Sequence, residues 1–302
     1  MAITAATKLS DLSGFIKPDL AAAYFEDAKK SSVIQRLARQ VPLSERGIEV
    51  PIVTEKPTAG WTAEGAKKHV TKNGMGLKTM SPKKLTAIAV VSAEVIRANP
   101  ANYVEILRAD IAEAFAKAFD AAVIHGTNSP FGAGTHLAAT TKAVKIGTNA
   151  SAKGGVFADV NAGLDLLVKD KKKLSGFVFD DVTEPIFNAS VDVNGRPLFV
   201  ADPINDTAST VRSGSVLGRP AAFSDTVANG TAAGSVVGIG GDWSKALWGA
   251  VGGISFDIST ESAVTINGEL TSLFENNLVA IRAEAEFGWA IADNSHFVKY
   301  TL

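Results

Sequence analysis

The clearest periodicity of apolar residues covers positions 99–126. Apolar side chains recur there every three to four residues, as they do along one face of an amphipathic helix. Asn99 is a suitable N-cap, Pro100 suits the first helical position, and Gly126 is a usual helix stop. We therefore predict one helix about 40 Å long. Its apolar face consists of Val104, Leu107, Ile111, Phe115, Phe119 and Val123.

A second pattern, near the C-terminus, alternates between apolar and charged positions over residues 279–289. A period of two is typical of a strand with one buried face, so this segment predicts a long, half-buried strand. The buried face would carry Val279, Ile281, Ala283, Ala285, Phe287 and Trp289, and the other face Arg282, Glu284 and Glu286.

Two further strand patterns are separated by a long polar segment. Gly47–Val53 and Leu85–Ser92 are rich in β-branched and apolar residues, and Pro51 favours an edge position for the first. The segment between them, 57–84, lacks a core pattern and is either a long hairpin or a mobile loop. Its lysine-rich part, Trp61–Lys84, contains six lysines and one acidic residue, which gives a local charge of +5.

The rest of the chain mixes helical and strand patterns, so the predicted class is α+β. A helical pattern runs from Pro18 to about Arg39, and residues 127–155 read as a connection rich in Gly, Thr, Asn and Ser. Residues 157–256 contain short elements of both kinds. The predicted helices are Val160–Val168 and Asp181–Asn188, and the predicted strands are Gly176–Phe179, Ser215–Phe223, Ser235–Ile239, Ala246–Ala250 and Ile254–Ile258.

Composition excludes several classes of protein. The chain has 302 residues, 46% of them hydrophobic, a formal net charge of −1 and no cysteine. Disulfide scaffolds, cysteine-ligated metal sites and intrinsic disorder are therefore excluded. A general nucleic-acid binder held by a basic face does not fit the neutral charge. No secretory signal and no apolar stretch of about 20 residues is present, so we predict no membrane partner.

Motifs for catalysis are also missing. The chain has no GxSxG, GxxxxGK[ST] or HExxH motif, and Gly238–Asp242 lacks the spacing of a phosphate-binding loop. His125 lies near Asp120 at the end of the predicted helix, where capping of the helix is favoured over a metal site. Trp243 and Trp248 are interpreted as core residues rather than a ligand wall. We predict no cofactor, no metal and no catalytic residue.

The chain thus offers extended elements without an active site. A long helix, a long amphipathic strand, a basic loop and an N-terminal arm cannot all bury their apolar faces within one subunit. This favours a structural protein that assembles with copies of itself over an enzyme.

Several motifs, in a shared order across residues 50–302, resemble those of the major capsid proteins of tailed bacteriophages with the Hong Kong 97-like fold. The Trp-x-x-Glu-Gly motif at the start of the family's extended loop has a counterpart here, as do its returning strand, its spine helix and several turns. The matching segments are Trp61-Thr-Ala-Glu-Gly65, Lys84–Ser92, Leu107–Gly126, Pro130-Phe-Gly132, Asn194–Phe199, Leu217-Gly-Arg-Pro220, Gly241–Lys245, Gly252–Ser255 and Phe274–Glu286.

The resemblance implies a division into four parts. Residues 1–46 would form an N-terminal arm and 47–91 an extended β-hairpin loop. A peripheral domain, with the long spine helix and long strands, would combine 92–126 with 256–302. A mixed α/β axial domain would occupy 127–255.

The resemblance also implies what the chain assembles into. Subunits of this family form hexamers and pentamers of an icosahedral shell, the virion capsid, which is assembled in the cytoplasm of the host bacterium. The shell encloses double-stranded DNA without sequence-specific contact. A portal, a scaffolding protein and a maturation protease or cement protein are expected partners, and the initiating Met1 favours a scaffold encoded as a separate protein.

Contact residues between subunits are expected on the extended loop. Some relatives also form cross-links there, in which a loop lysine attacks an asparagine side chain with help from a glutamate in an apolar setting. Asn277 and Glu284 occupy similar positions here and would lie on opposite faces of one strand, so they would act from different subunits. The alternative is that Glu284 pairs with an Arg or Lys across the strand. The candidate contact residues are Trp61, Glu64, Lys67, Lys68, Lys72 and Lys78, and the four lysines are also the cross-link candidates.

Two other functions remain open at this point. An encapsulin-type nanocompartment shell has a similar fold but encloses enzymes as cargo. A soluble α+β enzyme or ligand-binding protein would instead be a stable monomer or dimer with a closed pocket.

Overall fold

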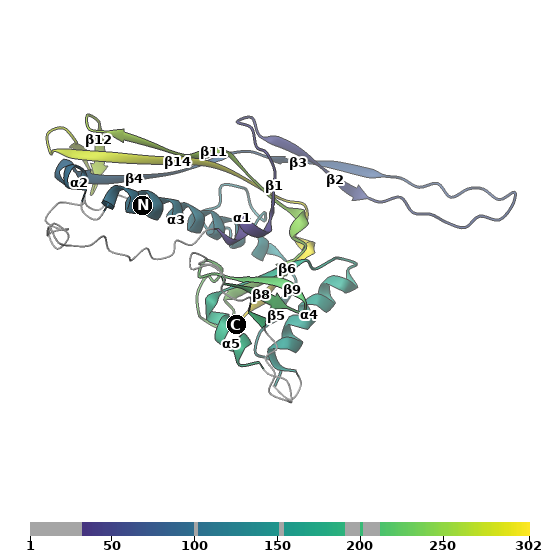
Figure 1. Ribbon diagram of the computed structural model, residues 1–302. Helices are drawn as coiled ribbons and strands as arrows, with labels where there is room; N and C mark the ends of the chain where they lie inside the picture. Colours follow the sequence, from purple (N-terminus) through teal and green to yellow (C-terminus); the bar gives the residue numbers. More distant parts are fainter. Residues whose placement is uncertain (1–31, 100–101, 151–153, 191–199, 202–211) are drawn as a thin grey trace.

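The computed structural model describes residues 32–99, 102–150, 154–190, 200–201 and 212–302. Figure 1 shows a long upper layer of strands over a helix, a lower body that contains the C-terminus, and a two-stranded ribbon that projects away from both. The predictions for residues 1–31, for Pro100 and for the 194–199 motif lie outside the described residues. Within the described residues, no helix is both long and apolar enough to cross a membrane.

The upper layer is a four-stranded sheet covered on one face by a long helix. Ile111 and Phe115 of the helix pack against Ala283 and Ala285 of the C-terminal long strand, whereas Arg282, which precedes Ala283, is exposed on the other face. The predicted alternation along this strand is therefore confirmed. In order, the strands are β1 (Arg39–Gln40), β11 (Ala246–Ser259), β14 (Leu278–Ile291) and β4 (Lys83–Ser92), and the helix is α3 (Tyr103–Ile124).

Helix α3 starts later than predicted. Asn99 is not its N-cap, because it ends the preceding helix α2 (Ala93–Ala98) in a left-handed conformation, with φ of 37°. The Asn99 side chain still accepts a hydrogen bond from the Val104 amide at 3.2 Å, while Asn102 is the residue before the first turn. The helix has 22 residues, which corresponds to about 33 Å rather than 40 Å.

The ribbon is a β-hairpin, so the hairpin alternative for the loop is confirmed. Strand β2 (Ile48–Glu55) pairs antiparallel with β3 (Gly74–Met80), and 56–73 connect them without regular structure. Eight residues of strand span about 26 Å, and Figure 1 shows the connection extending further still from the body.

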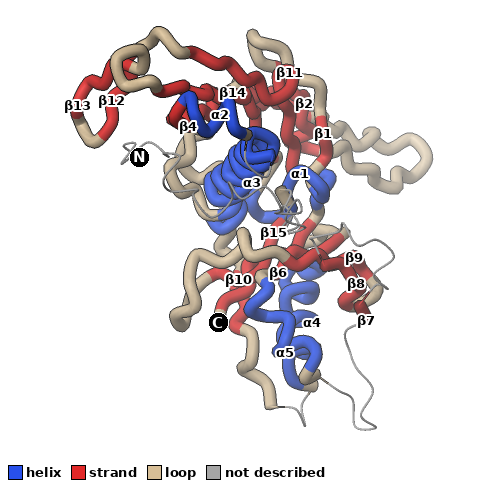
Figure 2. Tube along the Cα trace, turned by 60° about the vertical axis from the view of Figure 1, so that its left-hand side comes forward, coloured by secondary structure: helices blue, strands red, loops and turns tan. Residues whose placement is uncertain are grey.

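The lower body is a seven-stranded mixed sheet with helices beside it (Figure 2). Its aromatic core joins Phe177, Phe179, Phe223 and Tyr300, all without exposed surface. The strands are, in order, β5 (Ala143–Lys145), β15 (Phe297–Thr301), β10 (Val236–Gly241), β6 (Gly176–Phe179), β9 (Arg219–Phe223), β8 (Arg212–Val216) and β7 (Val200–Ala201).

The remaining described elements of the molecule are short, apart from α4. They are helices α1 (Val33–Leu37), α4 (Gly155–Lys169) and α5 (Glu184–Asn188), the hairpin β12 (Ala263–Ile266) and β13 (Glu269–Ser272), and the short turns η3 (Leu137–Ala139), η5 (Asp181–Thr183), η6 (Trp243–Lys245) and η7 (Asn294–His296).

Three of the predicted strands begin or end at the wrong places. The segment 215–223 is not one strand, because Leu217 and Gly218 adopt positive φ angles of 53° and 67° and form a two-residue hairpin turn between β8 and β9. Conversely, 246–250 and 254–258 are parts of one strand, β11. Gly252, with φ of 70°, allows an irregularity in the pairing with β14 without ending the strand.

A single apolar core joins the two sheets. Phe119 of α3 meets Trp248 and Trp289 of the upper sheet edge-on, at centroid distances of 6.5 and 6.4 Å. The same cluster includes Ile239 of the lower sheet, together with Trp243. The interpretation of Trp243 and Trp248 as core residues is therefore confirmed, with 4% and 9% of their surfaces exposed.

Sheet membership differs from the predicted domain boundaries at three places. Strand β4 was placed with the extended loop but pairs with β14 in the upper sheet. The first part of β11, before residue 256, also lies in that sheet rather than in the lower one. Strand β15 pairs with β10 and β5 in the lower sheet, although it follows the long C-terminal strand in sequence. Each strand joins its sheet by pairing with strands distant in sequence, and the local hydrophobic pattern contains no information about those partners.

Candidate functional site

The tip of the hairpin carries most of the predicted contact residues. Trp61 is fully exposed, at 107% of its reference surface, and Glu64, Lys67, Lys68 and Lys72 are exposed beside it in the sequence. We call these five residues the tip surface. Its connection is held by hydrogen bonds from the Thr58 amide to Thr71 at 2.8 Å and between Thr58 and His69 at 3.0 Å. An indole that no described residue of its own chain covers is an unusually large exposed apolar group and points to a partner.

Lys78 does not belong to the tip surface. It lies near the base of the hairpin on β3, half-buried, and its ammonium donates to the Ile291 carbonyl oxygen at 2.7 Å. The structure therefore separates it from the other three candidate lysines and ties it to the end of β14 in its own chain.

Sequence analysis missed an apolar face on the same hairpin. Val53, Met75 and Leu77 are 58%, 68% and 67% exposed. Val53 is opposite Met75, and Pro51 is opposite Leu77 in the antiparallel register, so the four side chains share one face. The alternation of Met75 and Leu77 with glycine and lysine was the signal that could have shown this face.

The two other cross-link candidates lie far apart in one chain. Asn277, with φ of 51°, precedes β14 instead of lying within it, so the prediction that it shares one strand with Glu284 is wrong. Seven residues of extended chain span about 23 Å. The Asn277 amide donates to the Glu94 carboxylate. Glu284 accepts from Lys84 on the neighbouring strand at 3.1 Å and lies 3.5 Å from Arg282, so the predicted ion pairing across the strand is confirmed.

A buried carboxylate, which sequence analysis did not select as a site, anchors the first described residues. Asp120 of α3 has no exposed surface and accepts hydrogen bonds from the Ser32 hydroxyl at 2.5 Å, the Val33 amide at 3.1 Å and the Thr226 hydroxyl at 3.0 Å. Burial raises the pKa of Asp120 to about 6, against the opposing effect of these donors. The cluster joins α1, α3 and the segment that follows β9.

His125 at the end of α3 contacts the protein backbone. Its Nε2 lies 2.7 Å from the Val227 carbonyl oxygen, and burial lowers the pKa of the imidazole. Across the described part of the chain, no group of three or more His, Asp or Glu side chains could hold a metal ion.

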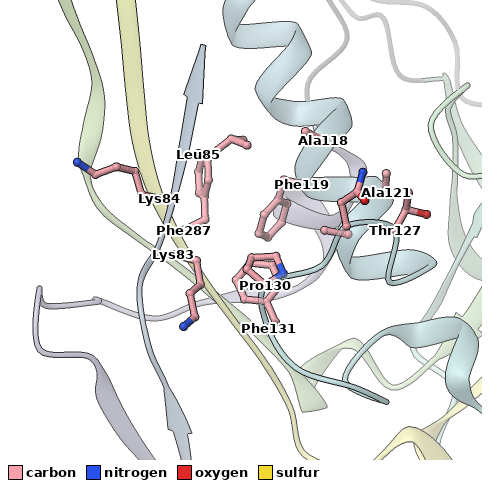
Figure 3. A pocket seen from close by; sticks show the side chains of 12 residues that line it. Lys83, Lys84, Leu85, Ala118, Phe119, Ala121, Thr127, Pro130, Phe131 and Phe287 are labelled. Carbon is pink, nitrogen blue, oxygen red and sulfur yellow. The ribbon is translucent and has the colours of Figure 1, made fainter. Parts of the chain in front are cut away.

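A cavity of about 460 Å³ lies beside the base of the hairpin. Figure 3 shows Phe119 of α3 and Phe131 of the following loop on one side, with Leu85 of β4 and Phe287 of β14 on the other. We call this cavity the base pocket. Its lining is mostly apolar, and its polar residues are Lys83, Lys84, Thr127 and Asn128.

Comparison with known proteins identifies the family. The sequence model of the phage capsid family matches residues 13–302. The probable major capsid protein gp17 of Mycobacterium phage D29 is 41% identical over 292 residues, which cover 95% of this chain and 90% of that protein. The chain belongs to the phage capsid family.

Solved capsid structures agree with this assignment. A chain from Gordonia phage Cozz matches with a TM-score of 0.74 and 26% identity, covering 95% of this chain and 91% of that one. A chain from Mycobacterium phage Cain matches with a TM-score of 0.75 and 18% identity over 98% of both chains. The Hong Kong 97-like fold predicted from the motifs is confirmed.

The predicted function, a major capsid protein of a tailed phage, is confirmed by the same comparisons. This capsid protein is a structural protein of the phage virion and not an enzyme, because its relatives are named as major capsid proteins. The encapsulin alternative and the enzyme alternative are not favoured by these matches.

Proposed function

We propose that this capsid protein forms hexamers and pentamers that tile an icosahedral head around double-stranded DNA, and that it assembles in the host bacterial cytoplasm. The observation that carries the proposal is the projecting hairpin, whose tip and apolar face are left exposed by the residues that the structure describes. A near-neutral net charge of −1 suits a wall that encloses DNA without binding its phosphates. A separate scaffold, a portal, and a maturation protease or cement protein would complete the head.

Three of the four parts expected from the resemblance are proposed with boundaries set by the sheets. The hairpin β2–β3 would be the extended loop, the four-stranded sheet with α3 the peripheral domain, and the seven-stranded sheet with α4 and α5 the axial domain. In this division β4 moves to the peripheral domain and β15 to the axial domain. Electron microscopy of the purified chain tests the assembly proposal, since it predicts rings or closed particles, and a population of small globules alone would contradict it.

The charge of the tip surface is expected to set the salt dependence of assembly. Replacing Lys67, Lys68 and Lys72 with glutamine removes three exposed cations from an edge contact, where charge governs association rate and register more than affinity. We expect slower assembly at low salt and a weaker response to added salt, measured by light scattering. The matched control places the same charge change at Lys169, Lys171 and Lys173 in the lower body; equal effects from both sets would refute the proposal.

We further propose that the subunits are held without covalent bonds between lysine and asparagine. A base for such a reaction needs an apolar setting that raises its pKa, whereas Glu284 is paired with Lys84 and Arg282, and the Asn277 amide is engaged with Glu94. Boiling assembled particles in denaturant should give only monomer on a gel. A ladder of multimers that disappears in an Asn277→Asp variant would show that the cross-link exists.

A further inference from the structure

The base pocket is shaped for an apolar side chain with a polar edge. Its volume of about 460 Å³ falls within the range of roughly 300–1,000 Å³ that holds organic groups in proteins. The rings of Phe119, Phe131 and Phe287 line it, and Figure 3 shows Pro130 beside them. Thr127 and Asn128 also line it, and both side chains carry an oxygen of the kind that accepts the hydrogen bond a buried indole N–H requires.

A cation marks one side of the pocket. Lys83 is exposed, extends from β4 with its ammonium directed out of the cavity (Figure 3), and forms no ion pair with the residues that the structure describes. The neighbouring Lys84 is different, because its ammonium is already paired with Glu284. An occupant that carries a carboxylate a few ångströms from its apolar group would therefore meet a free positive charge.

The tip surface offers both groups in one short segment. Trp61 is fully exposed, and Glu64 follows three residues later with its side chain in solvent. The tip cannot reach the pocket of its own chain. The pocket lies at the base of the hairpin, where Lys83 follows shortly after β3, and the paired strands hold the tip more than about 26 Å away.

We propose that Trp61 of a second copy of this chain inserts into the base pocket, with Glu64 of that copy facing Lys83. This inference rests on the proposed self-assembly and names the surface that receives the tip. The contact joins the tip of one hairpin to the base of the next, so it is heterologous, and such contacts close into rings when the rotation per subunit permits. A buried tryptophan surrounded by contacts that exclude water is the usual centre of binding energy in an interface.

Cross-linking through introduced thiols tests the geometry, because the chain has no cysteine of its own. In assembled full-length chains, Ala63→Cys combined with Thr127→Cys should give dimers and ring-sized multimers with a short bis-maleimide. The control pair Ala63→Cys with Thr231→Cys, an exposed site on the lower body, should stay monomeric. Glu275→Cys with Thr127→Cys tests another strongly exposed aromatic residue, Phe274, as the occupant. Cross-linking of that pair in place of the first would overturn the proposal.

Substitution of the exposed tryptophan gives a second test, because replacing a fully exposed side chain leaves the packing of the subunit itself unchanged. Trp61→Ala should raise the protein concentration needed for assembly on the order of tenfold, and Trp61→Phe should restore part of the loss. If wild-type chains form no rings or shells, the proposed self-assembly itself fails. If they form shells while Trp61→Ala assembles equally well and the first thiol pair stays monomeric, only the pocket assignment fails.

Discussion

Replacing Asp120 with alanine is expected to lower the free energy of unfolding by at least about 3 kcal/mol. The substitution leaves the Ser32 and Thr226 hydroxyls and the Val33 amide without their common acceptor. Each buried donor that loses its partner costs roughly 1–3 kcal/mol. Denaturant unfolding of the unassembled chain measures the effect, and a loss below 1 kcal/mol would show that the cluster does not hold α1 to α3.

The same residue predicts a specific dependence on pH. The pKa of Asp120 is about 6 in the folded chain against 3.8 for an ordinary aspartate. The folded state therefore binds more protons than the unfolded state between these values, and stability from this group falls as pH rises through that window. A rise of this size corresponds to on the order of 3 kcal/mol.

The isosteric Asp120→Asn variant isolates this effect, because an amide does not titrate. As pH increases from 4 to 7, the unfolding free energy of the wild type should fall relative to that of Asp120→Asn. Two stability curves that stay parallel over this range would mean that Asp120 titrates near its ordinary value.

Replacing Gly163 with alanine is expected to destabilise the lower body by about 3 kcal/mol, the upper part of the range for an overpacked core. A methyl group at Gly163 on α4 would lie 2.2 Å from the Tyr300 hydroxyl oxygen and 2.8 Å from its ring. Tyr300 cannot move away easily, because it is fully buried and donates to the Val160 carbonyl oxygen at 3.2 Å. Alanine would otherwise favour the helix by about 1 kcal/mol.

A matched variant separates the clash from helix propensity. Asn161→Ala changes an exposed position of the same helix and should be neutral or slightly stabilising. Combining Gly163→Ala with Tyr300→Leu should recover part of the loss if the clash is its cause. Thermal unfolding of all four chains measures these differences, and equal melting temperatures for Gly163→Ala and wild type would refute the close packing of α4 on β15.

The elements that sequence analysis predicted well are those whose burial repeats along the chain. Strand β14 alternates because α3 covers one of its faces, and the apolar stripe of α3 follows from the same contact. The predicted N-cap of α3 was wrong because Asn99 ends α2. Asparagine is favoured both before the first turn of a helix and after its last turn, and local sequence cannot distinguish these two positions. Strand β15 was assigned to the wrong sheet because its partners β5 and β10 are distant in sequence.

The residues of the candidate site also fall into two groups, those that the local sequence marks and those that only the fold brings together. Trp61 and Glu64 belong to a recognisable motif and the tip lysines to a basic segment, so sequence analysis could select them. Asp120 could not be selected, because its partners Ser32 and Thr226 are 88 and 106 residues away and nothing in the local sequence marks it as the buried acid among those of α3. The base pocket likewise combines β4, β14, α3 and the loop after it.

The core shared by the two sheets has a mechanical consequence. Swinging one sheet against the other would draw Phe119, Trp248 and Trp289 of the upper layer away from Ile239 and the other lower-sheet members of this core and expose them to water. Close-packed interiors resist such deformation. The hairpin has no comparable interior and is held to the body at its base, so bending there costs far less. A surface that curves differently around five-fold and six-fold rings would therefore take up its strain in the hairpins, while the bodies of the subunits stay stiff.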